Sequence, residues 1–203
     1  MKFPKYRSVN IELMTELLYW DYKSRFSLYN KLNNELKEKW IKLYPEHSII
    51  SEAGIKSLDE NLRKKIRKNA KDKFNIKGKF DHRIEVDFFS EQAWKLIQEK
   101  GLNGIGKKFR YEHIVPKKKF IQSKIEKKAR EGILGKKLKE EIKRLLEKFY
   151  YVALITIEED KKLLSLKLGN DMPNKWNDST GDIFARYKLA DINLIPNPFI
   201  ESE

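Results

Sequence analysis

The stretch YYVALITIEED, residues 150–160, contains the clearest fold signal in the chain. Its first seven residues are aromatic, aliphatic or β-branched and carry no charge, which predicts a buried β-strand over 150–156. Thr156 and Glu159 then have the spacing of a capping box, in which a Thr hydroxyl and a Glu carboxylate satisfy early backbone N–H groups of a helix. The sequence therefore predicts a strand that passes directly into a helix beginning at about residue 157.

A second strand is predicted upstream, where FRYEHIV at residues 109–115 has strand-type residues and Pro116 ends the run. Two helical stretches, at about 118–131 and 136–148, are separated by glycines and lie between the two strands. The sequence therefore predicts an α+β fold, mainly helical, in which a small two-stranded sheet carries a helical insertion over 118–148.

The N-terminal third is expected to be helical. Residues 10–25 and 27–43 repeat apolar residues at helical spacing, and Ser57–Glu60 forms another capping-box pattern before a helix over about 58–74. The apolar stripe of that helix is expected to comprise Leu58, Leu62, Ile66, Ala70 and Phe74. Its other faces are rich in lysine and arginine, so this helix has an apolar back and a basic front.

Three shorter elements complete the prediction. Ser90 and Gly101 bracket a short helix at 91–100. The stretch FDHRIEVDF, at 80–88, alternates like a strand with one polar face, and a short helix is expected near 182–190.

The basic charge of the chain is concentrated in two segments. The net charge is +14, from 44 basic and 30 acidic residues. Residues 63–79 have a net charge of +8 and residues 106–148 a net charge of +10, so the rest of the chain is net negative. Segregated basic charge is typical of proteins that bind nucleic acid.

Other features of the composition exclude several classes of protein. The chain has no cysteine, which excludes disulfides and cysteine-ligated zinc and favours an intracellular protein. It has no run of about 18 apolar residues that would span a membrane. Its N-terminus lacks the apolar stretch of a signal peptide. We therefore expect a cytoplasmic protein without a membrane partner.

The pentapeptide EHIVP, at 112–116, combines an acidic residue, a histidine, an aliphatic pair and a proline. Followed by a strand and an acidic helix start, it resembles the HNH family of ββα-metal endonucleases. The resemblance implies that Glu112 binds a divalent metal and that His113 is the general base. It also implies a second metal ligand in the opening turn of the helix, which is Asp160, with Glu159 as the alternative. The family usually has His or Asn there, and the middle Asn of its motif has no counterpart here.

These residue types suit the hydrolysis of a phosphodiester. Two carboxylates can hold Mg²⁺ or Mn²⁺, which prefer oxygen ligands. A neutral imidazole has a pKa close to the working pH, so it can activate a water molecule. The resemblance therefore implies a metal-dependent endonuclease, and by analogy one of restriction or defence type.

Double-stranded DNA is the expected partner. Residues 1–75 are predicted to form a helical region for DNA binding or dimerisation, and 76–203 the nuclease region with its basic insertion. A two-fold homodimer would suit an enzyme that cuts both strands. The residues expected to contact nucleic acid are Arg63, Lys64, Arg67, Lys68, Lys117, Lys118, Lys119 and Arg186.

Three alternatives remain open at this point. In a non-enzymatic nucleic-acid-binding protein, Glu112 and His113 would be a structural pair. An RNA-cleaving nuclease would use the same site on a different substrate. A nuclease of the PD-(D/E)xK type would instead draw on the acidic cluster Asp81, His82, Glu85 and Asp87, completed by Glu158 or Glu159 and Lys161.

Overall fold

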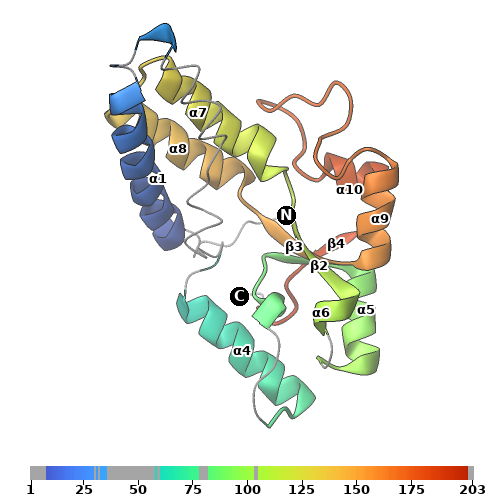
Figure 1. Ribbon diagram of the computed structural model, residues 1–203. Coiled ribbons are helices and arrows are strands. Elements are labelled where there is room, and N and C mark those ends of the chain that lie inside the picture. Colours follow the sequence, from blue (N-terminus) through green and yellow to red (C-terminus); the bar gives the residue numbers. More distant parts are fainter. Residues whose placement is uncertain are drawn as a thin grey trace. The chain divides into compact units, whose positions relative to one another are not determined.

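The computed structural model (Figure 1) describes residues 8–29, 31, 33–35, 58, 60–77, 82–102 and 105–200. These residues form two compact units. The sheet unit comprises the described residues of 56–116 and 150–203, and the helical unit comprises those of 8–55 and 117–149. The predicted α+β composition, mainly helical, is confirmed.

The sheet unit is built on a mixed sheet of four strands in the order β2-β3-β1-β4. The strands are β1 (Phe88–Ser90), β2 (Phe109–His113), β3 (Val152–Thr156) and β4 (Leu194–Pro196). β3 pairs antiparallel with β2 and parallel with β1, and β4 pairs antiparallel with β1. Both predicted strands are confirmed. The prediction of a two-stranded sheet was wrong, because two strands of only three residues extend it.

The register of β2 on β3 runs from Phe109 opposite Thr156 to His113 opposite Val152. Successive strand residues point to opposite faces of a sheet. The side chains of Phe109 and His113 therefore leave the strand on one face of the sheet, called here the core face. The side chain of Glu112 leaves it on the other, called the α9 face.

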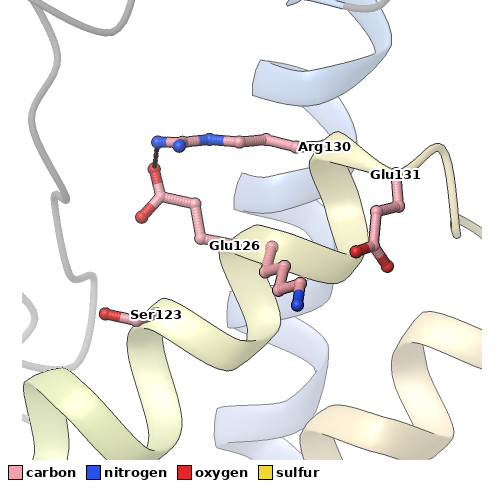
Figure 2. A pocket seen from close by; sticks show the side chains of 5 residues that line it. Ser123, Glu126, Arg130 and Glu131 are labelled. Carbon is pink, nitrogen blue, oxygen red and sulfur yellow. Dashed lines mark hydrogen bonds and ion pairs between the residues drawn. The ribbon is translucent and has the colours of Figure 1, made fainter.

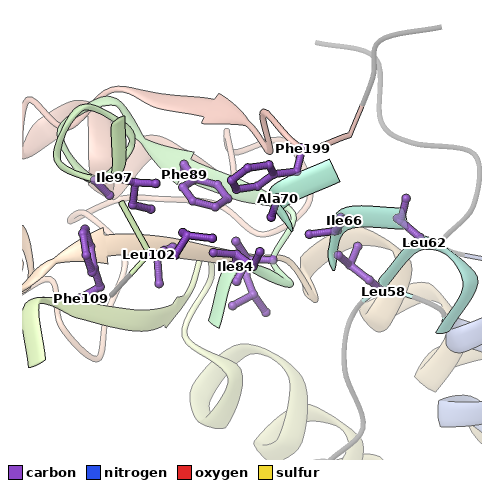
Figure 3. Close-up of a cluster of buried hydrophobic side chains, with 14 residues drawn as sticks. Leu58, Leu62, Ile66, Ala70, Ile84, Phe89, Ile97, Leu102, Phe109 and Phe199 are labelled. Carbon is purple, nitrogen blue, oxygen red and sulfur yellow. The ribbon is translucent and has the colours of Figure 1, made fainter. Parts of the chain in front are cut away.

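The core face holds a cluster of buried apolar side chains (Figure 3). It is covered by α4 (Glu60–Phe74) and α5 (Glu91–Lys100). The fully or almost fully buried members of the cluster are Leu58, Leu62, Ile66, Ala70, Ile84, Val86, Phe89, Ala93, Ile97, Leu102, Phe109, Val152, Leu154 and Phe199. The predicted apolar stripe of α4 is therefore confirmed, with its last residue Phe74 partly buried. Because α4 shares this core, it groups with the sheet and not with the N-terminal helix, unlike the expected boundary at residue 75.

The α9 face is covered by α9 (Ile157–Ser165), which packs on β2 and β3, and by the segment that contains α10 (Ala185–Leu189). The ring of Phe88 in β1 packs edge-on against Tyr151 and Phe184. Leu163 of α9 and Tyr187 of α10 are buried. The short helix predicted near 182–190 is thus confirmed, and it forms part of the cover over this face.

Two predicted helix starts are confirmed by their caps. The Ser90 hydroxyl accepts a hydrogen bond from the Ala93 N–H, 3.0 Å away, and opens α5, which ends at Gly101. Thr156 and Glu159 form both halves of the capping box that opens α9. Since Thr156 is also the last residue of β3, strand and helix join without a loop.

The segment before β1 is not the strand expected over 80–88. Residues His82–Ile84 form a short 3-10 helix (η2), and of the described residues in this stretch only Phe88 belongs to a strand. Glu85 and Asp87, which were expected on a polar face, are buried. The Asp87 carboxylate accepts a hydrogen bond from the backbone N–H of Val152, 2.9 Å away, and so joins β1 to β3.

The helical unit packs the N-terminal helix against the insertion. Its elements are α1 (Ser8–Tyr29), the π-helical turn η3 (Lys118–Gln122), α7 (Ser123–Arg130) and α8 (Lys136–Phe149). Ile11, Met14 and Leu18 of α1 are buried as predicted, whereas Leu17 is 37% exposed. The two helical stretches of the insertion are confirmed. Most of the helix predicted over 27–43, and the capping box at Ser57–Glu60, lie outside the described residues.

The remaining element of the sheet unit is the single turn α6 (Ile105–Lys108), which leads into β2. Among the described helices, none combines the length and the apolar character that a membrane span requires.

Replacing Thr156 by alanine is expected to lower the free energy of unfolding by about 1 kcal/mol more than replacing it by serine. Both variants lose the threonine methyl group, and only serine keeps the hydroxyl that caps α9. Urea unfolding followed by circular dichroism would measure the difference. Equal free energies for the two variants would show that the cap does not stabilise the junction between β3 and α9.

Candidate functional site

Glu112 and Asp160 lie on the same side of the sheet. Glu112 is the penultimate residue of β2 on the α9 face, and Asp160 is in the first turn of α9, which packs on that strand. Both side chains are largely buried, with 22% and 24% of their surface exposed. Burial raises the pKa of Glu112, Arg186 opposes this shift, and the negative charge of Asp160 adds to it. The two carboxylates are therefore close enough to repel each other.

Glu159, the alternative ligand, has structural contacts of its own. Its Oε2 accepts hydrogen bonds from the backbone N–H of Thr156, at 2.8 Å, and from the Ser90 hydroxyl, at 2.5 Å. This carboxylate completes the capping box and ties α9 to the start of α5. Asp160 takes no part in this cap, so it stays the expected ligand.

Arg110 is a site residue that the sequence reasoning missed. It precedes Glu112 by two positions and so shares the α9 face. Its Nε lies 3.6 Å from Asp160 Oδ2, and 53% of its side chain is exposed. The sequence held a signal for Arg110. Residues two positions apart on a strand share a face, so placing EHIVP on a strand puts Arg110 beside Glu112.

Arg186 lies inside the protein and not on a phosphate-binding surface, which corrects its expected role. Its side chain has no exposed surface. One N–H donates to Glu112 Oε1, 2.5 Å away, and the guanidinium also bonds the carbonyl oxygen of His113. Further hydrogen bonds reach the carbonyls of Ile114, at 2.9 Å, and Leu168, at 2.7 Å. The guanidinium is therefore occupied by protein groups.

His113 is not directed at the two carboxylates. As the last residue of β2 it starts from the core face, and its ring packs against Tyr150, with 5.2 Å between centroids and a 46° tilt. Within the described part of the chain, no three His, Cys, Asp or Glu residues lie close enough together to hold a metal ion. The structure thus places Glu112 and Asp160 on one face of the sheet and the His113 ring against Tyr150.

The Glu112–Asp160 pair still fits one kind of metal ion. Mg²⁺ keeps several water ligands and is commonly bound by one or two carboxylates together with substrate phosphates. The pair supplies oxygen ligands on two elements that pack together, and the negative charge of Asp160 adds to the raised pKa of Glu112. The residues present therefore suit Mg²⁺ or Mn²⁺.

The basic residues expected to bind nucleic acid fall into two groups. Arg63 and Arg67 of α4 pair with the buried Glu85, at 2.6 and 3.4 Å, and also with Glu60, so they serve the fold. Lys64 and Lys68, on the same helix, are exposed.

Three lysines follow the EHIVP segment, in the helical unit. Lys117 is half-buried, and burial lowers its pKa. Lys118 and Lys119 are exposed, and the Lys119 ammonium lies 5.6 Å from the Phe120 ring centroid. The two exposed lysines remain candidates for phosphate contacts.

The acidic cluster before β1 does not form a PD-(D/E)xK-type site in the described residues. Glu85 is paired with arginines and Asp87 with the β3 backbone. Asp81 lies outside the described residues. The buried carboxylates of this cluster therefore have structural partners.

A surface pocket of about 320 Å³ lies along α7 in the helical unit (Figure 2). It is lined by Ser123, Glu126, Lys127, Arg130 and Glu131. Arg130 donates a hydrogen bond to Glu126, one turn away on the same helix, at 2.7 Å, as the dashed line in Figure 2 marks. None of these residues belongs to the predicted site, and their charges are mixed, so the pocket favours no particular ligand.

Comparison with known proteins finds no family model, no curated protein and no solved structure that matches this chain.

Replacing Asp160 by asparagine is expected to lower the pKa of Glu112, because it removes a neighbouring negative charge. An NMR titration of the glutamate side-chain carboxyl carbons would measure this shift. Glu158→Gln is the matched control, since it removes an exposed charge from the same helical turn. An unchanged pKa in Asp160→Asn would contradict the proximity of the two carboxylates.

Proposed function

We propose that the chain is a metal-dependent endonuclease of the ββα-metal type, which hydrolyses phosphodiester bonds in DNA. The observation that carries the proposal is the succession of β2, β3 and α9, with Glu112 near the end of the first strand and Asp160 in the first turn of the helix, on one face of the sheet. The resemblance of EHIVP to the HNH motif and the concentrated basic charge support the same activity.

In this proposal the two carboxylates hold the cofactor and the histidine moves a proton. Glu112 and Asp160 would bind Mg²⁺ or Mn²⁺ through oxygen atoms. When bound, such an ion supplies Lewis-acid stabilisation of the charge that develops on the leaving oxygen. His113 would accept the proton of the attacking water. Its imidazole must turn away from Tyr150 to do so, and catalytic hydrogen bonds often form only when substrate is bound.

Arg110 would bind the phosphate that is cleaved. Its Nε lies 3.6 Å from Asp160 Oδ2, so the two groups form an ion pair. A cation bound by Asp160 would replace that interaction and leave the half-exposed Arg110 available to a phosphate, which its planar fork matches in geometry. The exposed lysines of the sheet unit, Lys64 and Lys68, and those of the helical unit, Lys118 and Lys119, would neutralise phosphates without reading the sequence.

A second candidate is a nucleic-acid-binding protein without catalytic activity. The packing of the His113 ring on Tyr150 favours this alternative, because it gives the histidine a structural role. The Glu112–Arg186 ion pair would then serve only the fold. In this case the basic residues would be the whole functional surface.

Cleavage of plasmid DNA with Mg²⁺ or Mn²⁺ distinguishes the two candidates. The wild type is expected to cleave the plasmid, and cleavage is expected to stop when EDTA is added. His113→Ala is expected to cleave about 10²- to 10⁴-fold more slowly than the wild type, which is the usual contribution of a general base. Asp160→Asn is expected to lose activity by removing a metal ligand.

Glu158→Gln provides the control for that experiment, because it changes an exposed carboxylate in the turn that contains Asp160. It is expected to cleave at the wild-type rate. If the wild type shifts DNA on a gel but cuts neither DNA nor single-stranded RNA with either metal, the endonuclease proposal is wrong and the binding protein is supported. Cleavage of RNA alone would assign the same site to a ribonuclease.

The salt dependence of DNA binding tests the role of α4. In the double variant Lys64→Ala/Lys68→Ala, the slope of log Kobs against log salt concentration is expected to fall by about 2, since each lost phosphate contact removes about 0.9. Fluorescence anisotropy with a labelled duplex would measure it. Lys95→Ala/Lys100→Ala on α5 removes two exposed charges of the same kind and is the control. Equal slopes in the two double variants would exclude α4 from the DNA-binding surface.

A further inference from the structure

Arg186 is the largest side chain that is completely buried in the described residues. Its guanidinium makes hydrogen bonds to the Glu112 carboxylate and to the carbonyls of His113 and Ile114, at the end of β2. It also bonds the carbonyls of Leu168, at 2.7 Å, and Gly169, at 3.1 Å, in the turn that follows α9. One side chain therefore connects the strand that carries Glu112 with the end of the helix that carries Asp160.

The chemistry of this contact differs from that of an ordinary buried ion pair. Two charges taken out of water are often no more favourable than apolar residues of the same volume, so a fully buried arginine needs several well-made hydrogen bonds. Arg186 makes them with a planar fork that can bond several acceptors at once. Its guanidinium bonds Glu112 Oε1, and the Glu112 side chain is still 22% exposed.

Metal-binding carboxylates are commonly oriented by such a partner. Hydrogen-bond partners behind the ligands fix the ligand geometry, and their loss typically weakens metal binding by 10- to 100-fold. Arg186 contacts one candidate ligand directly, and it holds the end of the element that supplies the other. Arg110, by contrast, is half exposed and reaches only Asp160 within this pair.

We propose that Arg186 is the positioning residue of the Glu112–Asp160 site, which fixes the Glu112 carboxylate and the spacing of β2 and α9 for one divalent cation with oxygen ligands. This inference rests on the metal site of the proposed function, though not on DNA cleavage. Arg186 touches neither substrate nor cation and acts through Glu112 and the backbone.

Calorimetric titration of the full chain with Mn²⁺, without DNA, tests the proposal. The wild type is expected to bind one Mn²⁺, and Arg186→Met is expected to bind it 10- to 100-fold more weakly. Arg186→Lys keeps the positive charge beside Glu112 but lacks the fork, so it is expected to recover part of the loss. Lys188→Met removes an exposed cation from the same short helix and is expected to bind like the wild type.

A second measurement uses the wild-type protein, because Arg186→Met removes a buried cation and can fail to fold. The Nε–H of Arg186 donates to the Ile114 carbonyl at 2.9 Å and is sheltered from solvent. Its NMR resonance is expected to move on titration with Mg²⁺ and to stay unchanged in Asp160→Asn.

Each outcome bears on the positioning role. Equal Mn²⁺ affinity in Arg186→Met and Lys188→Met would overturn the positioning role. An Arg186 Nε–H resonance that does not move when Mg²⁺ is added to the wild type would overturn it as well. Absence of Mn²⁺ binding by the wild type would overturn both this role and the metal site. If Mn²⁺ binds and depends on Arg186 but DNA is not cut, the positioning role stands and the endonuclease proposal alone fails.

Discussion

The register between β2 and β3 is the constraint on which the rest of the candidate site depends. Five residue pairs join the strands, and a shift of one residue would move Glu112 from the α9 face to the apolar core face. β3 is buried along its whole length, so such a shift would place a carboxylate among the aromatic residues of the core. Burial thus fixes the register, and the register places Glu112 opposite α9.

A second constraint is the way in which the sheet unit buries charge. Glu85 sits in the interior against Arg63, and Asp87 accepts a backbone N–H of β3. Arg186 and Glu112 form a third buried contact of this kind. The first two groups are enclosed and are bonded to other parts of the fold, which makes them structural. Glu112 differs because its side chain is 22% exposed and because the negative charge of Asp160 acts on it, and this combination supports the proposed metal site.

The sequence predicted the elements whose signals are local. The apolar run of β3, the capping box of α9 and the fourfold stripe of α4 each depend on neighbouring residues, and all three are present. The three-residue strands β1 and β4 were missed because they form only through pairing with distant segments. Arg63 and Arg186 were expected at the surface for the same reason. Their partners, Glu85 and Glu112, lie 22 and 74 positions away, and no local pattern reveals a buried arginine.

The position of His113 follows from where β2 ends. Neighbouring residues of a strand point to opposite faces, so Glu112 and His113 can serve one site only where the strand gives way to another conformation. That change occurs here, since β2 ends at His113 and the next two residues form a bend. The carbonyls of His113 and Ile114 both turn to Arg186 at this point. The buried arginine therefore holds the segment in which the histidine could approach the carboxylates, and it links the backbone of the proposed base to the proposed metal ligand.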